Sequence, residues 1–201
     1  QTVLSFGGMR HYVRLAEDPR AEAGRATLPR RVMERLHMPD YPVYELAVRG
    51  NELRVGPVIG LLMSREAAGL NAEHLKHMRR YVREYDRLHG AVVVFSLEGV
   101  DPVGRLVEGY CYHPGAGRFE PGIFPYPGVI YRTIGLNRQW KDHFLATVEG
   151  GFFNCPYFNK WDTHRWFAAD PAIGPHIPAT VRYESPRQAG EMLRRYGALY
   201  I

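Results

Sequence analysis

Two continuous apolar runs, separated by one helix-length segment, constrain the fold more than any other feature. Residues 58–63 read VIGLLM and residues 91–96 read AVVVFS. Runs without polar alternation are typical of strands that are buried on both faces. Between them, apolar side chains recur at helical spacing within a predicted helix over residues 71–89. This strand–helix–strand order predicts a parallel sheet with a right-handed crossover.

Later segments extend the same sheet. Residues 107–119 predict an inserted hairpin that turns at residues 114–117, and residues 129–132, VIYR, predict a further sheet strand. A helix over residues 138–148 and a short strand at residues 152–154 follow. The segment from residue 57 to residue 157 therefore forms one predicted α/β domain.

The section before the first apolar run has a different residue pattern, with short strand-like stretches and turn residues. Residues 2–15 are strand-like, and a short helix is expected from Pro29. Residues 43–48 and 52–55 predict a hairpin around the turn Arg49-Gly50-Asn51, where Gly and Asn adopt positive φ readily. We interpret residues 1–56 as a small, mainly β subdomain.

The last section, residues 158–201, is predicted to be mostly helical. One helix is expected near residues 159–167 and another over residues 186–196, with Ser185 as N-cap and Gly197 as C-cap. Residues 198–201, ALYI, predict the start of a strand.

Composition narrows the class of protein. Hydrophobic residues make up 45% and charged residues 23%, as in globular domains. No apolar run is long enough to span a bilayer, and the first residues lack a signal-peptide pattern, so no membrane partner is expected. Two cysteines, Cys111 and Cys155, do not make a disulfide framework and favour a reduced, cytoplasmic location. The net charge of +5 favours anionic partners, although solvated surface charge is the default interpretation.

Ser64 and Arg65 follow the first buried strand, where loops of parallel sheets form ligand crevices. The functional interpretation is that both side chains face a substrate. The alternative is an ordinary strand-to-helix loop, because the sequence has no Gly-rich phosphate-binding fingerprint.

Two residue pairs could be taken for metal ligands. His74 and His77 share a helix face, and Cys111 and His113 share a strand face. Zinc sites need more convergent ligands than two. An exposed basic helix and a core thiol beside a surface histidine are therefore the preferred interpretations, and no metal site is predicted.

Lys160 lies at a predicted helix start within an aromatic-rich stretch, residues 153–164. A cation at this end of a helix opposes the macrodipole, and a bound phosphate would relieve the conflict. The alternative is that Lys160 extends into solvent.

Five short motifs in a fixed order resemble the YheC/YheD-like family of ATP-grasp proteins, which is associated with endospore coats. They are Gly56-Pro57-Val58-Ile59-Gly60, Val129-Ile130-Tyr131, Phe153-Asn154, Asn159-Lys160-Trp161 and Pro175-His176-Ile177-Pro178-Ala179-Thr180. The resemblance implies an α/β fold in which the small β subdomain is followed by a Rossmann-like, parallel-sheet pre-ATP-grasp domain. Residues 158–201 would then begin an ATP-grasp lobe.

The resemblance also implies a function. Lys160 would contact ATP, and the second ATP lysine, the Mg²⁺ ligands and the adenine pocket would lie beyond Ile201. The complete protein would be an ATP-dependent carboxylate–amine ligase that acts on a small-molecule carboxylate, whereas this chain alone would be inactive and would bind no cofactor. Spore-coat proteins are the partners implied.

Arg132 departs from the family pattern. Family members read Tyr-Asn-Arg at the end of the third strand, whereas this sequence reads Tyr131-Arg132-Thr133. A shift of one residue on a strand sends a side chain to the opposite face. Arg132 is thus a substrate-binding candidate whose role differs from that of the family's arginine.

Two other classes of function stay open at this stage. One is a non-enzymatic spore-coat or scaffold protein that uses exposed aromatic residues as an adhesive surface. The other is a basic nucleic-acid-binding module, which is the weakest hypothesis because no reader motif is present, so no nucleic-acid partner is expected.

Overall fold

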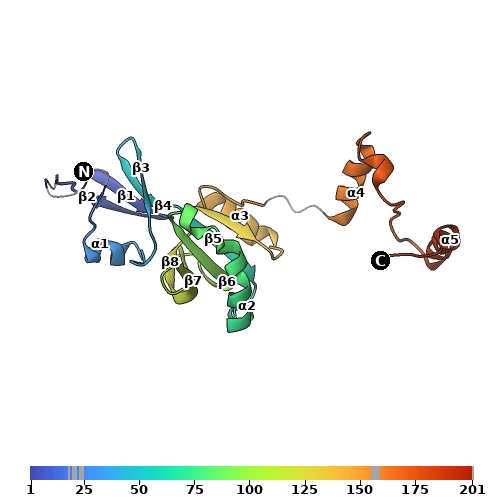
Figure 1. The fold of residues 1–201 in the computed structure, drawn as a ribbon, viewed down its shortest axis with the longest axis horizontal. Coiled ribbons are helices and arrows are strands. Elements are labelled where there is room, and N and C mark those ends of the chain that lie inside the picture. The colour runs from blue at the N-terminus through green and yellow to red at the C-terminus, as the bar shows by residue number, and fades with distance from the viewer. Residues whose placement is uncertain (18, 20–21, 23–24, 155–158, 201) are drawn as a thin grey trace. The chain divides into compact units, whose positions relative to one another are not determined.

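The three apolar runs lie in one sheet. In the computed structural model, which describes residues 1–17, 19, 22, 25–154 and 159–200, a five-stranded sheet has the order β8-β7-β6-β5-β9 (Figure 1). Its centre consists of β5 (Val58–Ser64), β6 (Ala91–Asp101) and β9 (Val129–Arg132). Strand β5 is parallel to both β6 and β9. The prediction of one sheet with three parallel strands is confirmed.

The inserted hairpin extends this sheet on the β6 side. It consists of β7 (Leu106–His113) and β8 (Arg118–Pro125), which are antiparallel to each other, and β7 is antiparallel to β6. The turn at residues 114–117 lies where the sequence predicted it. The sheet is therefore mixed, and the fold class is α/β.

The predicted helix over residues 71–89 is broken into three pieces: α2 (Ala72–Met78), η2 (Arg79–Val82) and η3 (Tyr85–Arg87). The Asn71 side chain caps α2 by accepting a hydrogen bond from the backbone N–H of His74. Basic residues recur three and four positions apart from Lys76 to Arg83. Like charges at this spacing destabilise an α-helix, which accounts for the break.

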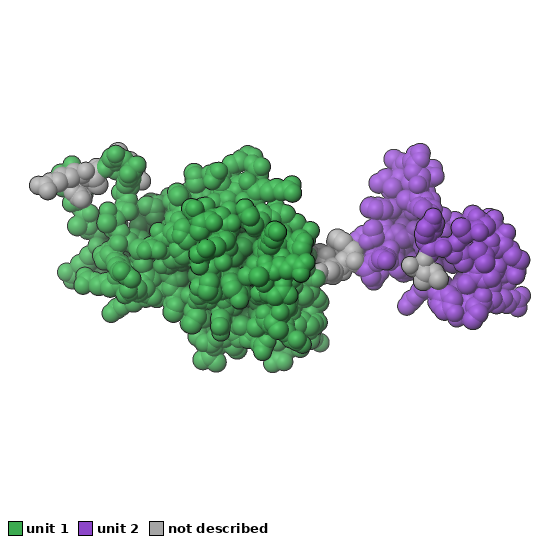
Figure 2. Space-filling view, turned by 60° about the horizontal axis from the view of Figure 1, so that its bottom comes forward, with its two compact units in different colours: residues 1–154 green, residues 155–201 purple. Residues whose placement is uncertain are grey.

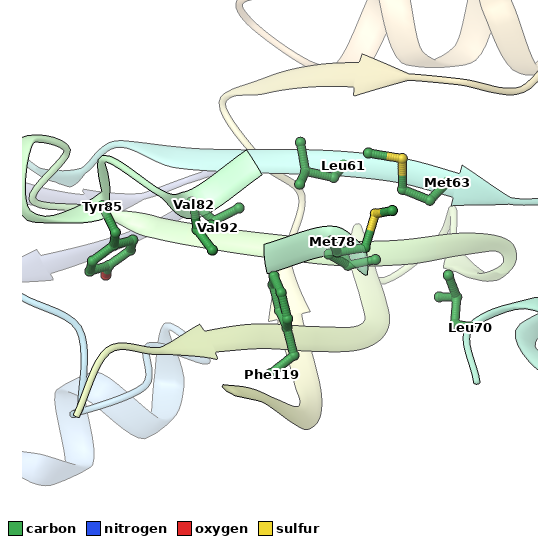
Figure 3. Close-up of a cluster of buried hydrophobic side chains, with 9 residues drawn as sticks. Leu61, Met63, Leu70, Met78, Val82, Tyr85, Val92 and Phe119 are labelled. Atoms are coloured by element: carbon green, nitrogen blue, oxygen red, sulfur yellow. The ribbon is translucent and has the colours of Figure 1, made fainter. Parts of the chain in front are cut away.

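The broken helical segment still covers one face of the sheet. Figure 3 shows Met78, Val82 and Tyr85 beside strand residues of β5 and β6. The buried cluster consists of Leu61, Met63, Leu70, Met78, Val82, Tyr85, Val92, Val94 and Phe119. The predicted packing of this segment on one face is confirmed.

Helix α3 (Arg138–Thr147) begins after Asn137, whose side chain accepts a hydrogen bond from the Trp140 N–H. Its Phe144 is fully buried, and its ring lies 6.0 Å from that of Phe152. The strand predicted at residues 152–154 is wrong: it reduces to a single parallel bridge between Ile130 and Phe152.

The amino-terminal section forms a second, four-stranded sheet of order β2-β1-β4-β3. Its elements are β1 (Thr2–Phe6), β2 (Met9–Val13), helix α1 (Arg30–Arg35), β3 (Glu45–Arg49) and β4 (Glu52–Gly56). The single strand expected over residues 2–15 is instead a hairpin, because Gly7 at φ +54° reverses the chain. The hairpin predicted around the turn Arg49-Gly50-Asn51 is confirmed as β3 and β4. Independent folding of residues 1–56 stays a prediction.

The chain divides into two units, residues 1–154 and residues 155–201 (Figure 2). The second contains α4 (Lys160–Ala169), η4 (Gly174–His176) and α5 (Pro186–Tyr196). Ser185 caps α5 by accepting from the Gln188 N–H, and Gly197 ends it at φ +74°, so both predicted caps are confirmed. Over residues 159–200 no side chain is buried.

The strand expected over residues 198–201 is not formed by residues 198–200, and Ile201 lies outside the described residues. A strand requires a neighbour for its backbone groups, and the second unit has no sheet in the part that is described. Cys155 and the predicted boundary between residues 157 and 158 also lie outside the described residues. None of the described helices is long and apolar enough to cross a membrane.

Candidate functional site

The carboxyl ends of β5, β6 and β9 meet at one edge of the five-stranded sheet. The register pairs Leu62 with Arg132 and Ser64 with Ser96. Three of the four predicted site residues, Ser64, Arg65 and Arg132, therefore come to the same edge. Lys160, the fourth, belongs to the other unit.

Ser64 forms a local turn. Its Oγ donates to the Glu66 carbonyl oxygen at 2.8 Å and lies 3.3 Å from the Glu66 N–H. The short helix η1 (Ala67–Gly69) follows. A Cβ on Gly69 would lie only 2.2 Å from Ser64 Oγ, so this close approach requires glycine. In this structure the hydroxyl of Ser64 organises the loop.

Arg65 joins the loops that follow β5 and β9. Its exposed guanidinium donates through Nη2 to the Gly135 carbonyl oxygen at 2.6 Å. Its own carbonyl oxygen accepts from the Glu98 N–H at 2.9 Å, which ties the β5 loop to β6. Arg65 thus places one positive charge on the solvent side of this edge.

Arg132 has a different environment from Arg65, because its side chain is buried, with 5% of its surface exposed. Nη1 donates to the Ile134 carbonyl oxygen at 3.0 Å, and the guanidinium carbon lies 5.2 Å from the centre of the Phe152 ring. Arg132 shares its face of β9 with buried Ile130, as the two-residue strand period requires. The contacts of Arg132 connect β9 to the loop after it and to Phe152 on the buried side of this sheet edge.

Asn154 and Thr133 complete this edge, and neither was predicted from the sequence to be a site residue. Asn154 Oδ1 accepts from the Arg132 N–H at 3.0 Å, and its Nδ2 donates to the Arg132 carbonyl oxygen at 2.7 Å. The Thr133 N–H donates to the Leu62 carbonyl oxygen at 3.0 Å. A side-chain amide is the residue type that can satisfy both backbone groups of one strand residue, and this was the available signal for Asn154.

A cavity of about 410 Å³ lies beside η1 and β6, and Ser96, Glu98, Glu108 and Tyr110 are among its lining residues. Glu98 Oε2 accepts from the Ala67 N–H at 2.6 Å. Neither Ser64 nor Arg65 lines this cavity. Two carboxylates favour a cationic group over a carboxylate ligand.

A larger cavity of about 630 Å³ lies at the opposite end of the parallel strands, beside Val58 and Val129. Four charged side chains form a ladder along it: Arg10 to Glu52 at 3.6 Å, Glu52 to Arg54 at 3.1 Å, and Arg54 to Glu149 at 3.1 Å. Hydrogen bonds from Ser5 and then Arg54 lower the pKa of Glu52. These charges satisfy one another, so the ladder links the amino-terminal sheet to the segment after α3.

Lys160 is the first residue of α4, and it is exposed. Asn159 is the N-cap: its Oδ1 accepts from the Asp162 N–H at 2.8 Å, and its Nδ2 donates to Asp162 Oδ2 at 2.6 Å. The carboxylate of Asp162 therefore provides the negative charge that this helix end favours. Lys160 itself lies exposed at this helix end.

The two residue pairs considered as metal ligands have ordinary environments. Cys111 is fully buried in β7, and His113 stacks on Tyr41 with ring centres 4.4 Å apart. Both His74 and His77 lie in α2. In the part of the chain that the structure describes, no three His, Cys, Asp or Glu residues are placed to hold a metal ion.

Residues 150–201 match the family model described as YheC/D like ATP-grasp. The predicted resemblance to this family is confirmed.

The chain is 22% identical over 186 residues to the endospore coat-associated protein YheD of Bacillus subtilis (strain 168). The match covers 87% of this chain and 40% of that protein, so the chain spans well under half the length of this relative. No solved structure shows a significant match.

Proposed function

We propose that this chain is the amino-terminal part of an ATP-grasp protein whose complete form is an ATP-dependent carboxylate–amine ligase linked to the spore coat. In this proposal, residues 57–157 are a Rossmann-like pre-ATP-grasp domain and residues 158–201 begin the nucleotide-binding lobe. The observation that carries the proposal is the ATP-grasp match over residues 150–201, a segment that contains Lys160.

The second unit supports this proposal because its described helices have no buried core of their own. From residue 159 to residue 200 it has two helices of ten and eleven residues but no buried side chain. Trp166, Phe167 and Leu193 are exposed by 53%, 46% and 48%. Apolar surface of this extent is stabilised when other elements cover it. Further lobe elements would bury these residues and enclose Lys160.

The described residues fit only part of a site for MgATP. Lys160 would contact a phosphate group, and no described cluster of carboxylates is available for Mg²⁺. A single exposed lysine gains little from a phosphate because water screens the interaction. The chain's own contribution is therefore to place one cation at a capped helix end, and we expect this chain by itself to bind no cofactor.

Calorimetric titration with MgATP tests the proposal. The 201-residue chain should bind weakly or not at all, whereas a form extended through the rest of the protein should bind. In the extended form, Lys160→Ala should weaken binding about tenfold, because one charge-assisted hydrogen bond is lost. Lys141→Ala is the matched control, since Lys141 is an exposed lysine of α3. Equal, tight binding by the 201-residue chain would show that the proposal is wrong.

The carboxyl edge that carries Ser64, Arg65 and Arg132 is the proposed place for the carboxylate substrate. Arg65 is the exposed cation there, and its guanidinium already reaches the loop after β9. Arg65→Ala in the extended form should raise the KM for the carboxylate and leave MgATP binding unchanged. Loss of MgATP binding in this variant would contradict the assignment.

A non-enzymatic coat protein is the second candidate. It is favoured by the similarity to a coat-associated relative and by exposed apolar side chains such as Tyr12 and Val43, which are 70% and 59% exposed. Formation of ADP by the extended form in the presence of a carboxylate and an amine would decide for the enzyme.

A further inference from the structure

Strand β3 is an open edge of the amino-terminal sheet. It is the terminal strand in the order β2-β1-β4-β3 (Figure 1), and all five of its residues are exposed. Val48 is 77% exposed and Leu46 is 38% exposed. An exposed edge of this kind presents unpaired backbone groups and apolar side chains to another chain.

In the part of the chain that the structure describes, the other three sheet edges carry features that oppose pairing with another chain. Strand β8 contains Pro121 and Pro125, which donate no backbone hydrogen bond. Strand β9 is already bridged to Phe152. Strand β2 has the basic residue Arg10 beside His11 at its centre.

Strand β3 differs from these three edges, because its charged residues, Glu45 and Arg49, lie at its two ends and leave an uncharged centre. Its sequence, ELAVR, contains no proline, and its register with β4 runs without a bulge. Proteins normally protect open sheet edges. An edge whose centre lacks protection, in a chain whose other described edges have it, indicates an interaction surface.

The turn of the hairpin determines which backbone groups are free. Arg49 and Glu52 close a two-residue turn and so form a hydrogen-bonded pair. Because such pairs alternate along an antiparallel ladder, Ala47 also bonds to β4. Leu46 and Val48 therefore direct their N–H and C=O groups toward the open edge.

The strand is complementary to itself. In an antiparallel pairing centred on Ala47, Glu45 faces Arg49 of the second copy, and Leu46 faces Val48 of the second copy. The opposite charges attract each other, and the exposed apolar side chains cover each other. Leu46 and Val48 exchange backbone hydrogen bonds at both ends, since these residues direct their groups outward.

From this complementarity we infer that two copies of this chain associate through β3, in antiparallel register about Ala47. The two four-stranded sheets join into one continuous sheet with twofold symmetry. The pairing uses only five residues from each chain, so the dimer forms at high protein concentration and dissociates on dilution.

One contact of β3 within the chain is compatible with this pairing. The Glu45 N–H donates to the His89 carbonyl oxygen at 2.9 Å. The dimer uses the backbone groups of Leu46 and Val48 and leaves that bond intact. The His89 Nδ1 lies 3.9 Å from Glu45 Oε1, and the carboxylate of Glu45 is 69% exposed. Its charge therefore stays available to Arg49 of the second copy.

Sedimentation equilibrium of the 201-residue chain tests the association. We expect a reversible monomer–dimer equilibrium. Arg49→Glu places two carboxylates opposite each other at both ends of the strand and should weaken the dimer about tenfold or more. Adding Glu45→Arg to the same chain restores opposite charges and should restore the dimer. A chain that stays monomeric at every concentration, or a double variant that does not recover, overturns the inference.

A second pair of variants separates the edge from general surface hydrophobicity. Val48→Lys should abolish the dimer, because lysine protects open edges. Val103→Lys is the matched control, since Val103 is a 92% exposed valine on the turn between β6 and β7. Circular dichroism confirms that each variant is folded. An equal effect of both substitutions contradicts association through β3.

Cross-linking reports the register. In the proposed pairing, the two Ala47 residues form a pair without hydrogen bonds, with Cα atoms about 4.5 Å apart, which suits a disulfide. Ala47→Cys in a Cys155→Ser background should form a disulfide-linked dimer under mild oxidation. Ala116→Cys, at an exposed turn between β7 and β8, is the control. Cross-linking at Ala47 that is no faster than at Ala116 rejects this register.

Discussion

Arg132→Ala should lower the free energy of unfolding of the first unit by about 3 kcal/mol, because a buried hydrogen-bonded charge and its volume are both lost. The side chain is 5% exposed, donates to the Ile134 carbonyl oxygen, and stacks its guanidinium on Phe152. Alanine leaves that carbonyl without this donor and opens space beside the ring. Urea unfolding followed by circular dichroism measures the change.

The matched control is Arg65→Ala. Arg65 also donates to a loop carbonyl oxygen, that of Gly135, but its side chain is exposed. Water replaces such a bond, so the expected loss is below about 1 kcal/mol. A small loss for Arg132→Ala as well would mean that the Arg132 side chain leaves the interior easily and is free to bind a substrate. The comparison therefore separates a stabilising arginine from a ligand-binding one.

The central sheet could be predicted from the sequence because its signals are local and redundant. The runs that became β5 and β6 are too apolar for any exposed face. The turn Gly50-Asn51 sets the register of the β3–β4 hairpin. The caps Ser185 and Gly197 satisfy backbone groups within a few residues of themselves.

The predictions that were wrong concern segments whose structure depends on charge or on contacts with distant residues. The break after Met78 follows from like charges between Lys76 and Arg83, a signal that was present but outweighed by apolar spacing. The strand predicted at residues 152–154 would need a neighbouring strand along its whole length. In the structure this segment instead forms a single bridge, between Phe152 and Ile130.

For the candidate site, the order of the strands predicts which residues come together, whereas the residue types do not predict the contacts that their side chains make. That Ser64 and Arg132 come to one edge follows from the parallel order alone. The burial of Arg132 depends on Phe152, and the role of Asn154 depends on the path of the chain after α3. Such contacts join segments about 20 residues apart, and a periodic pattern of apolar residues in the sequence does not indicate them.

Cys111 should react with iodoacetamide at pH 8 about 1,000-fold more slowly in the folded chain than in urea, because burial raises the pKa of its thiol from 9.0 to about 12. Hydrogen bonds from Tyr41 and from the Val92 backbone act in the opposite direction but are outweighed. A Cys155→Ser background leaves Cys111 as the one thiol in the sequence.

The same shift sets a pH dependence of stability. The pKa of the folded thiol is raised, so between pH 9 and about 12 the unfolded chain binds fewer protons than the folded chain. The contribution of the buried thiol is therefore complete below pH 9 and is lost as the pH rises toward 12. Cys111→Ala should remove this part of the alkaline destabilisation, which urea titrations at several pH values measure.

The labelling rate also reports how firmly the amino-terminal section packs on the larger sheet. Tyr41 lies between α1 and β3, contacts Cys111 and stacks on His113, so it covers the thiol from outside the five-stranded sheet. Tyr41→Ala should raise the labelling rate of Cys111 about tenfold by exposing it. Tyr12→Ala, which removes a 70% exposed tyrosine of β2, should leave the rate unchanged. If residues 1–56 separate from the sheet easily, Cys111 will label quickly even with Tyr41 in place. Slow labelling that Tyr41→Ala accelerates means instead that the amino-terminal section stays packed over the thiol.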